Sequence, residues 1–68
     1  MPIIDYVQNL RIEEAKSLLE TTDRPAEDIS IEVGYEDSSF FRRLFKRGTG
    51  LSPSRYRQAF KSAKLRLA

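Results

Sequence analysis

The side chains best suited to chemistry gather in one short segment, residues 37–47. This segment is rich in hydroxyl groups and cations, and their spacings of one, three and four residues keep them close together on a helix. Arginine and lysine in such a row bind phosphates, and a guanidinium can also donate two hydrogen bonds to a base edge. The chemistry indicated is the binding of a polyanion. The candidate binding residues are Ser38, Ser39, Arg42, Arg43, Lys46 and Arg47.

A second group of candidates lies a few residues further along. Ser52 before Pro53 is typical of a helix start, with serine as the N-cap and proline at the first helical position. The free backbone N–H groups and positive dipole of such an end can hold a phosphate, and nearby arginines add charge. A plain N-cap is the alternative role of the serine, and the two roles are compatible. The second group comprises Ser52, Ser54, Arg55 and Arg57.

The residue types that most enzymes use are absent. The chain has no His and no Cys, so the commonest general bases, nucleophiles and soft metal ligands are missing. Carboxylates remain, such as Glu13 with Glu14, or Asp37, but so small a chain offers no pocket around them. We therefore expect no catalytic residue, no metal site and no cofactor, and we predict that the chain is not an enzyme.

The charges are divided between the two halves of the chain. All ten acids lie within residues 1–37, which contain three bases and therefore carry a net charge of −7. Residues 38–68 contain nine bases and no acid, a net charge of +9. An ordinary soluble surface mixes the two signs. The charge asymmetry therefore indicates that the C-terminal half binds a polyanion, with nucleic acid favoured over an anionic membrane.

A membrane partner is not expected. No apolar run approaches the roughly 20 residues that cross a bilayer, and the N-terminus lacks the features of a signal peptide. Residues 55–68 could form a basic surface helix, but Leu65 and Leu67 give it little apolar face. The absence of cysteine suits a reducing compartment, so we expect a cytoplasmic location.

Proline and glycine divide the chain into four predicted helices, near residues 3–21, 25–33, 37–47 and 52–63. Apolar residues recur within them at spacings of three and four, as the buried face of a helix requires. The length allows one domain with a small core. The sequence therefore predicts a small all-α fold without strands. The expected core includes Leu18, Ile29, Val33, Phe41, Phe45 and Phe60.

The second and third predicted helices are short, and their connection is tight. Ser30 is small enough for the helices to approach closely, Gly34 permits a positive φ, and Tyr35 can pack the turn onto the core. Glu36 and Asp37, the latter a good N-cap, make the connection about one residue longer than a minimal turn. The pattern indicates a helix-turn-helix of the homeodomain-like kind, whose second helix enters the major groove of DNA.

Residues at many spaced positions also match one known pattern. They are Arg11, Ile12, Ala15, Lys16, Leu18, Leu19, Thr21, Thr22, Asp23, Arg24, Pro25, Ile29, Val33, Gly34, Tyr35, Asp37, Ser39, Phe40, Phe41, Arg43, Phe45, Lys46, Gly50, Leu51, Ser52, Pro53, Tyr56 and Arg57. Residues 7–60 thereby resemble the C-terminal part of the DNA-binding domain of AraC/XylS-type bacterial transcription regulators. The resemblance implies a linker helix at 3–21, the second of the family's two helix-turn-helix units at 25–47 and a closing helix at 52–63.

The resemblance also implies a function. It is sequence-specific binding of double-stranded DNA in transcription regulation, with the recognition helix 37–47 in the major groove. The family's first helix-turn-helix unit and effector domain are absent from these 68 residues, so we expect them in the full-length protein. Contact with RNA polymerase is a further expectation from the family.

Within the recognition helix the expected roles differ. Ser38, Ser39 and Arg42 lie on the first two turns, where side chains reach base edges. Lys46 and Arg47 lie toward the C-terminal end and are expected to meet phosphates.

Two alternatives remain open. Arg43 could contact DNA or could brace the fold by pairing with Asp37, whereas Arg11 in the linker helix is expected to be structural. The chain as a whole could instead be a helical protein-interaction module that meets a basic partner, for example on RNA polymerase. Its acidic N-terminal face would comprise Glu13, Glu14, Glu20, Glu27 and Asp28.

Overall fold

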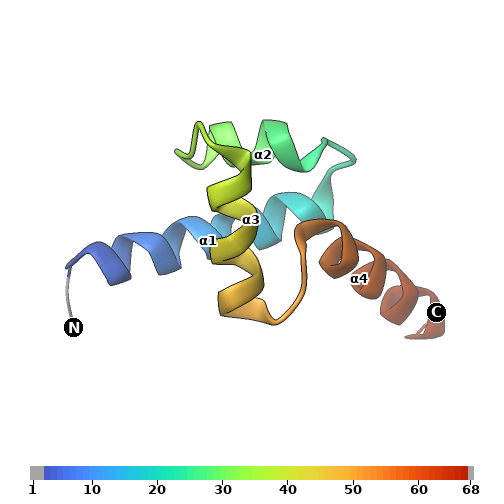
Figure 1. The fold of residues 1–68 in the computed structure, drawn as a ribbon. Helices are drawn as coiled ribbons and strands as arrows, with labels where there is room; N and C mark the ends of the chain where they lie inside the picture. Colours follow the sequence, from blue (N-terminus) through green and yellow to red (C-terminus); the bar gives the residue numbers. More distant parts are fainter. Residues whose placement is uncertain (1–2, 68) are drawn as a thin grey trace.

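Four helices make up the fold, which Figure 1 shows for a computed structural model of the chain. The structure describes residues 3–67. In chain order the helices are α1 (Ile3–Thr21), α2 (Ala26–Glu32), α3 (Ser38–Thr49) and α4 (Pro53–Leu67). No strand occurs in this described part, and none of its helices is long and apolar enough to cross a membrane. The all-α prediction is confirmed.

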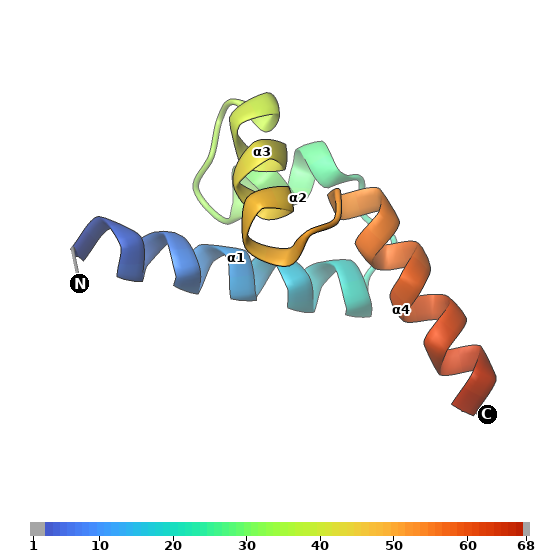
Figure 2. The same ribbon diagram turned by 60° about the horizontal axis from the view of Figure 1, so that its bottom comes forward.

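The long helix α1 is the base of the bundle and contacts each of the other three helices. Figures 1 and 2 show α2 and α3 against the middle and C-terminal part of α1, with α4 leaving from the same end. The first turns of α1 and the last turns of α4 project from the bundle at opposite ends. The core therefore lies around the C-terminal half of α1.

The ends of the two middle helices differ from the prediction. The predicted helix 25–33 is shorter at both ends, because Pro25 is an extended N-cap (φ −61°, ψ 152°) and Val33 is the C-cap. The predicted helix 37–47 begins one residue later and runs on through Gly48 to Thr49. A helix absorbs one glycine at a cost of about 1 kcal/mol. Gly50, with a φ of 84°, ends α3 instead.

The first and last helices also test the prediction. The predicted bounds 3–21 of α1 are confirmed. The predicted helix 52–63 starts one residue later and extends to Leu67. No glycine or proline follows Pro53, and the residues beyond 63 are good helix formers, so nothing in the chain ends α4 earlier.

The core is aromatic and aliphatic, and it confirms four of the six predicted core residues. Leu18 and Phe60 are the exceptions, because both are only partly buried. Leu18 packs against the core cluster, beside the fully buried Leu19, whereas the cluster does not include Phe60. The buried apolar residues are Ile12, Ala15, Leu19, Ile29, Val33, Tyr35, Phe41 and Phe45.

The turn between α2 and α3 is closed by hydrogen bonds around a buried serine. Ser30 Oγ donates to the carbonyl of Tyr35 (2.7 Å), and the Tyr35 N–H donates to the carbonyl of Ser30 (2.8 Å). Gly34 has a φ of 109°, and a Cβ there would lie 3.1 Å from Cζ of Arg11. The Arg11 guanidinium also lies 5.2 Å from the centroid of the Tyr35 ring. Arg11 of α1 therefore packs against the turn.

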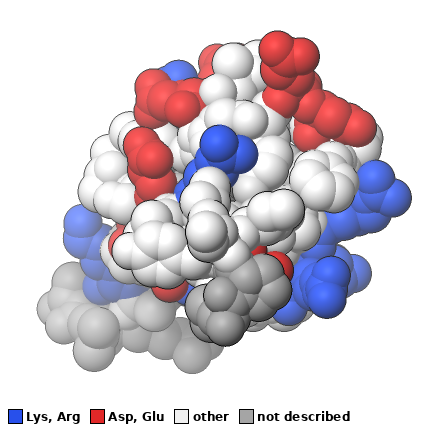
Figure 3. Space-filling view, turned by 90° about the vertical axis from the view of Figure 1, so that its left-hand side faces the viewer, with Lys and Arg blue, Asp and Glu red and all other residues white. Residues whose placement is uncertain are grey.

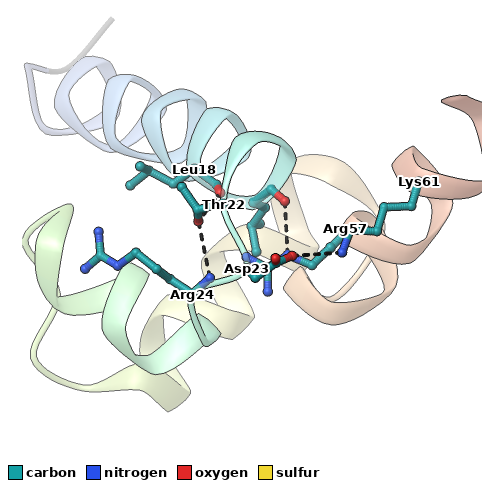
Figure 4. A network of polar contacts seen from close by, with 7 residues as sticks. Leu18, Thr22, Asp23, Arg24, Arg57 and Lys61 are labelled. Carbon is teal, nitrogen blue, oxygen red and sulfur yellow. Dashed lines mark hydrogen bonds and ion pairs between the residues drawn. The ribbon is translucent and has the colours of Figure 1, made fainter.

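The end of α1 is tied to α2 and α4, as Figure 4 shows. Thr22 Oγ1 donates to the carbonyl of Leu18 (2.7 Å) and accepts from the N–H of Arg24 (3.3 Å). Asp23 forms an ion pair with Lys61 of α4 (3.1 Å). The hydrogen bond and the charge of Lys61 hold the pKa of Asp23 below its usual value. These contacts fix the path of the chain from α1 into α2.

Tyr56 forms a second tie between α1 and α4. Its hydroxyl donates to Oε2 of Glu20, and its ring meets that of Phe45 edge-on, with centroids 5.4 Å apart. The hydrogen bond to Glu20, together with burial, raises the pKa of Tyr56 to about 12. The folded pKa exceeds the unfolded value of about 10, so this stabilisation is complete below about pH 10 and is lost as the pH rises to about 12.

Replacing Tyr56 by Phe is expected to lower stability near neutral pH and to make its decline between about pH 10 and pH 12 less steep. The phenol that loses its proton in this range is then absent. Urea unfolding at a series of pH values measures the effect. Tyr6→Phe removes an exposed tyrosine of α1 and should behave as the unsubstituted chain does. An unchanged pH dependence in Tyr56→Phe would show that the bond to Glu20 contributes nothing.

Candidate nucleic-acid interface

Helix α3 has one face in the core and the opposite face in solvent. Phe41 and Phe45, four residues apart, are fully buried and fix which face points inward. Of the predicted binding residues on this helix, Ser38 is half-buried beside the core face. All the others are exposed: Ser39, Arg42, Arg43, Lys46 and Arg47. The predicted outward face of the helix is therefore present.

Asp37 begins α3 as the predicted N-cap. Its Oδ1 atom accepts hydrogen bonds from the backbone N–H groups of Ser39 (2.9 Å) and Phe40 (3.3 Å). Within residues 3–67, Asp37 forms no ion pair with Arg43. Asp37 thus caps the helix, and the side chain of Arg43 remains in solvent.

A row of aromatic rings holds α3 against the turn and α4. The centroid of the Tyr35 ring lies 5.9 Å from that of Phe40 and 6.0 Å from that of Phe41. Phe41 then lies 5.8 Å from Phe45, which lies 5.4 Å from Tyr56. Such edge-on and tilted pairs add to the stabilisation from burial alone. The outward face of α3 is therefore presented by a rigid element.

The cations of α3 differ in their surroundings. Arg42 reaches back to α2, where its Nη2 atom donates to Oε1 of Glu27. Arg43 and Lys46 have no ion pair among the described side chains. Arg47 lies beside an open groove between α3 and α1, whose lining includes acidic side chains of α1. Arg43 and Lys46 are thus exposed positive charges of the helix without an ion-pair partner among the described side chains.

The second group of predicted residues lies at the start of α4. The Arg55 N–H donates to Ser52 Oγ (3.3 Å), which agrees with the predicted N-cap. Ser54 and Arg55 are exposed. Arg57 is placed differently: its Nε atom donates to the carbonyl of Leu19 (3.0 Å), and its Nη2 atom is buried. Ser52, Ser54 and Arg55 therefore lie at the start of α4, whereas Arg57 fastens α4 to α1.

Most acidic side chains of the expected acidic face have partners within the fold. Figure 3 shows acidic side chains mainly along the upper part of one face, and basic side chains at its right-hand edge, near its centre and at its lower left. Glu13 pairs with Lys16 (3.2 Å), and Glu20 and Glu27 accept hydrogen bonds from Tyr56 and Arg42. Glu20 and Glu27 therefore contact other helices, whereas the pair of Glu13 lies within α1.

Glu27 is the residue near the site that sequence reasoning missed. The sequence indicates it only as part of an acidic face, yet it contacts Arg42, fifteen residues later. No local pattern of the sequence indicates this pair, because it forms between two different helices. Among the described residues, no group of three or more acidic side chains is arranged to hold a metal ion.

Comparison with known proteins agrees with this geometry. Residues 1–59 match the profile of a family described as "Helix-turn-helix domain". The HTH-type transcriptional activator RhaR of Klebsiella pneumoniae is 41% identical over 63 residues, which cover 93% of this chain and 22% of that protein. The arabinose operon regulatory protein of Salmonella typhimurium is 40% identical over 55 residues, which cover 81% of this chain and 20% of that protein.

A solved structure has the same fold. The C-terminal domain of AraT, a response regulator from Geobacillus stearothermophilus, superposes with a TM-score of 0.84 at 34% identity, covering 87% of this chain and 49% of that one. Of the two curated relatives named above, the chain spans about a fifth of the length. The matched profile, the relatives and the arrangement of α2 and α3 agree, and the chain belongs to the AraC-type helix-turn-helix family.

Proposed function

We propose that this chain binds double-stranded DNA in a sequence-specific manner and serves transcription regulation. The observation that carries the proposal is the outward face of α3, where exposed cations stand opposite Phe41 and Phe45. An α-helix fits the major groove of DNA, and such a face supplies donors for both phosphates and bases. The named relatives are transcription regulators, which supports a binding module over an enzyme.

The residues of α3 divide by their distance from the end that enters the groove. Ser39 and Arg42 lie on the first two turns and are assigned to base edges, with Ser38 beside them. An arginine there can donate to O6 and N7 of a guanine. The exposed cations further along, and Arg43 between the two regions, are assigned to phosphates.

The start of α4 is assigned to a phosphate. The backbone N–H of Ser54, with the exposed side chains of Ser54 and Arg55, suits an anion at the positive end of a helix of fifteen residues. Arg57, which the sequence also indicated, is left out of the proposed contact surface. Its guanidinium is engaged with α1, so its contribution to DNA binding would be to hold α4 in place.

Binding of duplex DNA by the 68-residue chain is expected to be weak and steeply dependent on salt. A single reading helix is present, so the Kd should lie at about 10⁻⁴ to 10⁻⁶ M at physiological salt. About four to six cations could neutralise phosphates, which predicts a slope of about −4 to −5 for log K against log salt. Fluorescence anisotropy with a labelled duplex measures both quantities. Nanomolar binding that ignores salt, or no binding at low salt, would contradict the proposal.

A further inference from the structure

Arg42 meets its partner across the helix-turn-helix and not along its own helix. Its Nη2 atom donates to Oε1 of Glu27, in the first turn of α2. The helices α2 and α3 pack against each other, and the two side chains remain 47% and 55% exposed. The pair therefore lies at the edge of the proposed DNA-binding face, with one side of the guanidinium open to solvent.

We propose that Glu27 is a positioning residue for base recognition, an inference that rests on the proposed function. The carboxylate holds the guanidinium of Arg42 in one orientation before DNA arrives. A guanidinium has five N–H donors, and the contact with Glu27 uses one of them. A bidentate grip on a guanine needs two, so the pair can persist while Arg42 contacts a base.

Two physical effects allow the Glu27–Arg42 pair to favour the specific DNA complex over other complexes. A free arginine side chain has many rotamers, and ordering it before binding removes part of the entropic cost of the specific contact. The negative charge of Glu27 also opposes the approach of a phosphate to Arg42, which disfavours complexes in the wrong register. Glu27 therefore favours the specific complex and disfavours the others.

The chain offers a matched control on the same helix. Glu32 is the other acid of α2 with an ion pair, and it binds Arg24 (2.6 Å) with its side chain 42% exposed. Glu32→Ala removes the same charge from α2 as Glu27→Ala does, but leaves Arg42 and its partner in place. Circular dichroism should show that both variants keep the fold, because both side chains are exposed.

The experiment compares base preference. Selection from a randomised duplex library with the unsubstituted chain defines a preferred sequence, and Arg42→Ala identifies the base position at which preference depends on Arg42. Anisotropy then gives the Kd for the preferred duplex and for one changed at that base. We expect Glu27→Ala to lower the ratio of the two affinities by about twofold or more, partly by strengthening binding to the changed duplex. Glu32→Ala should strengthen both and leave the ratio unchanged.

Four outcomes would overturn the inference in distinguishable ways. If Glu27→Ala keeps the preference that Arg42→Ala loses, Arg42 reads the base without help, and the proposed function stands. If the variant with both Glu27→Ala and Arg42→Ala has a lower base preference than Arg42→Ala alone, Glu27 affects base preference independently of Arg42. Equal binding to every duplex refutes the sequence-specific part of the proposed function and leaves no base preference for Glu27 to support. The absence of binding to any duplex refutes the proposed function as a whole.

Discussion

Replacing Phe45 by Ala is expected to remove a large part of the stability of the domain. Phe45 is fully buried, and its ring centroid lies 5.8 Å from that of Phe41 and 5.4 Å from that of Tyr56. Truncation of a buried phenylalanine costs about 3–5 kcal/mol. A domain of 68 residues has a free energy of unfolding of about 3–10 kcal/mol. The substitution therefore removes between a third and all of it.

Urea unfolding followed by circular dichroism measures this loss. Phe40→Ala is the matched control, because Phe40 lies on the same helix but is 40% exposed and contacts one aromatic ring, that of Tyr35. We expect it to cost about 1 kcal/mol. A Phe45→Ala variant that unfolds at the same urea concentration as the unsubstituted chain would show that α3 packs with a different face.

The fold could be predicted where one local interaction decides the structure. Asp37 caps α3 and Gly34 takes a positive φ, and both features depend on the nature of the residue itself. The end of α3 could not be predicted in this way, because Gly48 and Gly50 both permit a helix to end. The Thr49 hydroxyl lies within hydrogen-bond distance of the carbonyl oxygens of Phe45 (2.8 Å) and Leu51 (2.9 Å), either of which can accept its one proton, and these contacts accompany the longer helix.

In the candidate site, too, local features could be predicted from the sequence and contacts between helices could not. Spacing alone predicted which side chains of α3 are exposed, because Phe41 and Phe45 fix the buried face. The partners of two arginines could not be predicted. Arg57 bonds to the carbonyl of Leu19, 38 residues earlier, and Arg42 bonds to Glu27. Such contacts depend on how whole helices pack, and no spacing within one helix indicates them.

Arg42 and Lys46 share the outward face of α3, yet we expect their removal to have different effects. They are four residues apart, so Arg42 lies one turn nearer the N-terminal end, which contacts bases in helix-turn-helix proteins. Arg42→Ala should weaken binding to the preferred duplex by about 1–3 kcal/mol and relax preference at about one or two base positions. Lys46→Ala should weaken binding to all duplexes about equally and reduce the salt slope by about one unit.

Anisotropy titrations with the preferred duplex and a scrambled duplex, each at several salt concentrations, separate the two effects. Lys64→Ala is the control for the loss of one positive charge, since Lys64 is an exposed residue of α4 in the turns that project from the bundle. All three side chains are exposed, so none of the substitutions should alter unfolding by urea. If Arg42→Ala left affinity and base preference unchanged in an intact fold, the proposed orientation of α3 would be wrong. The roles assigned to Ser38, Ser39 and Arg43 would then be lost with it.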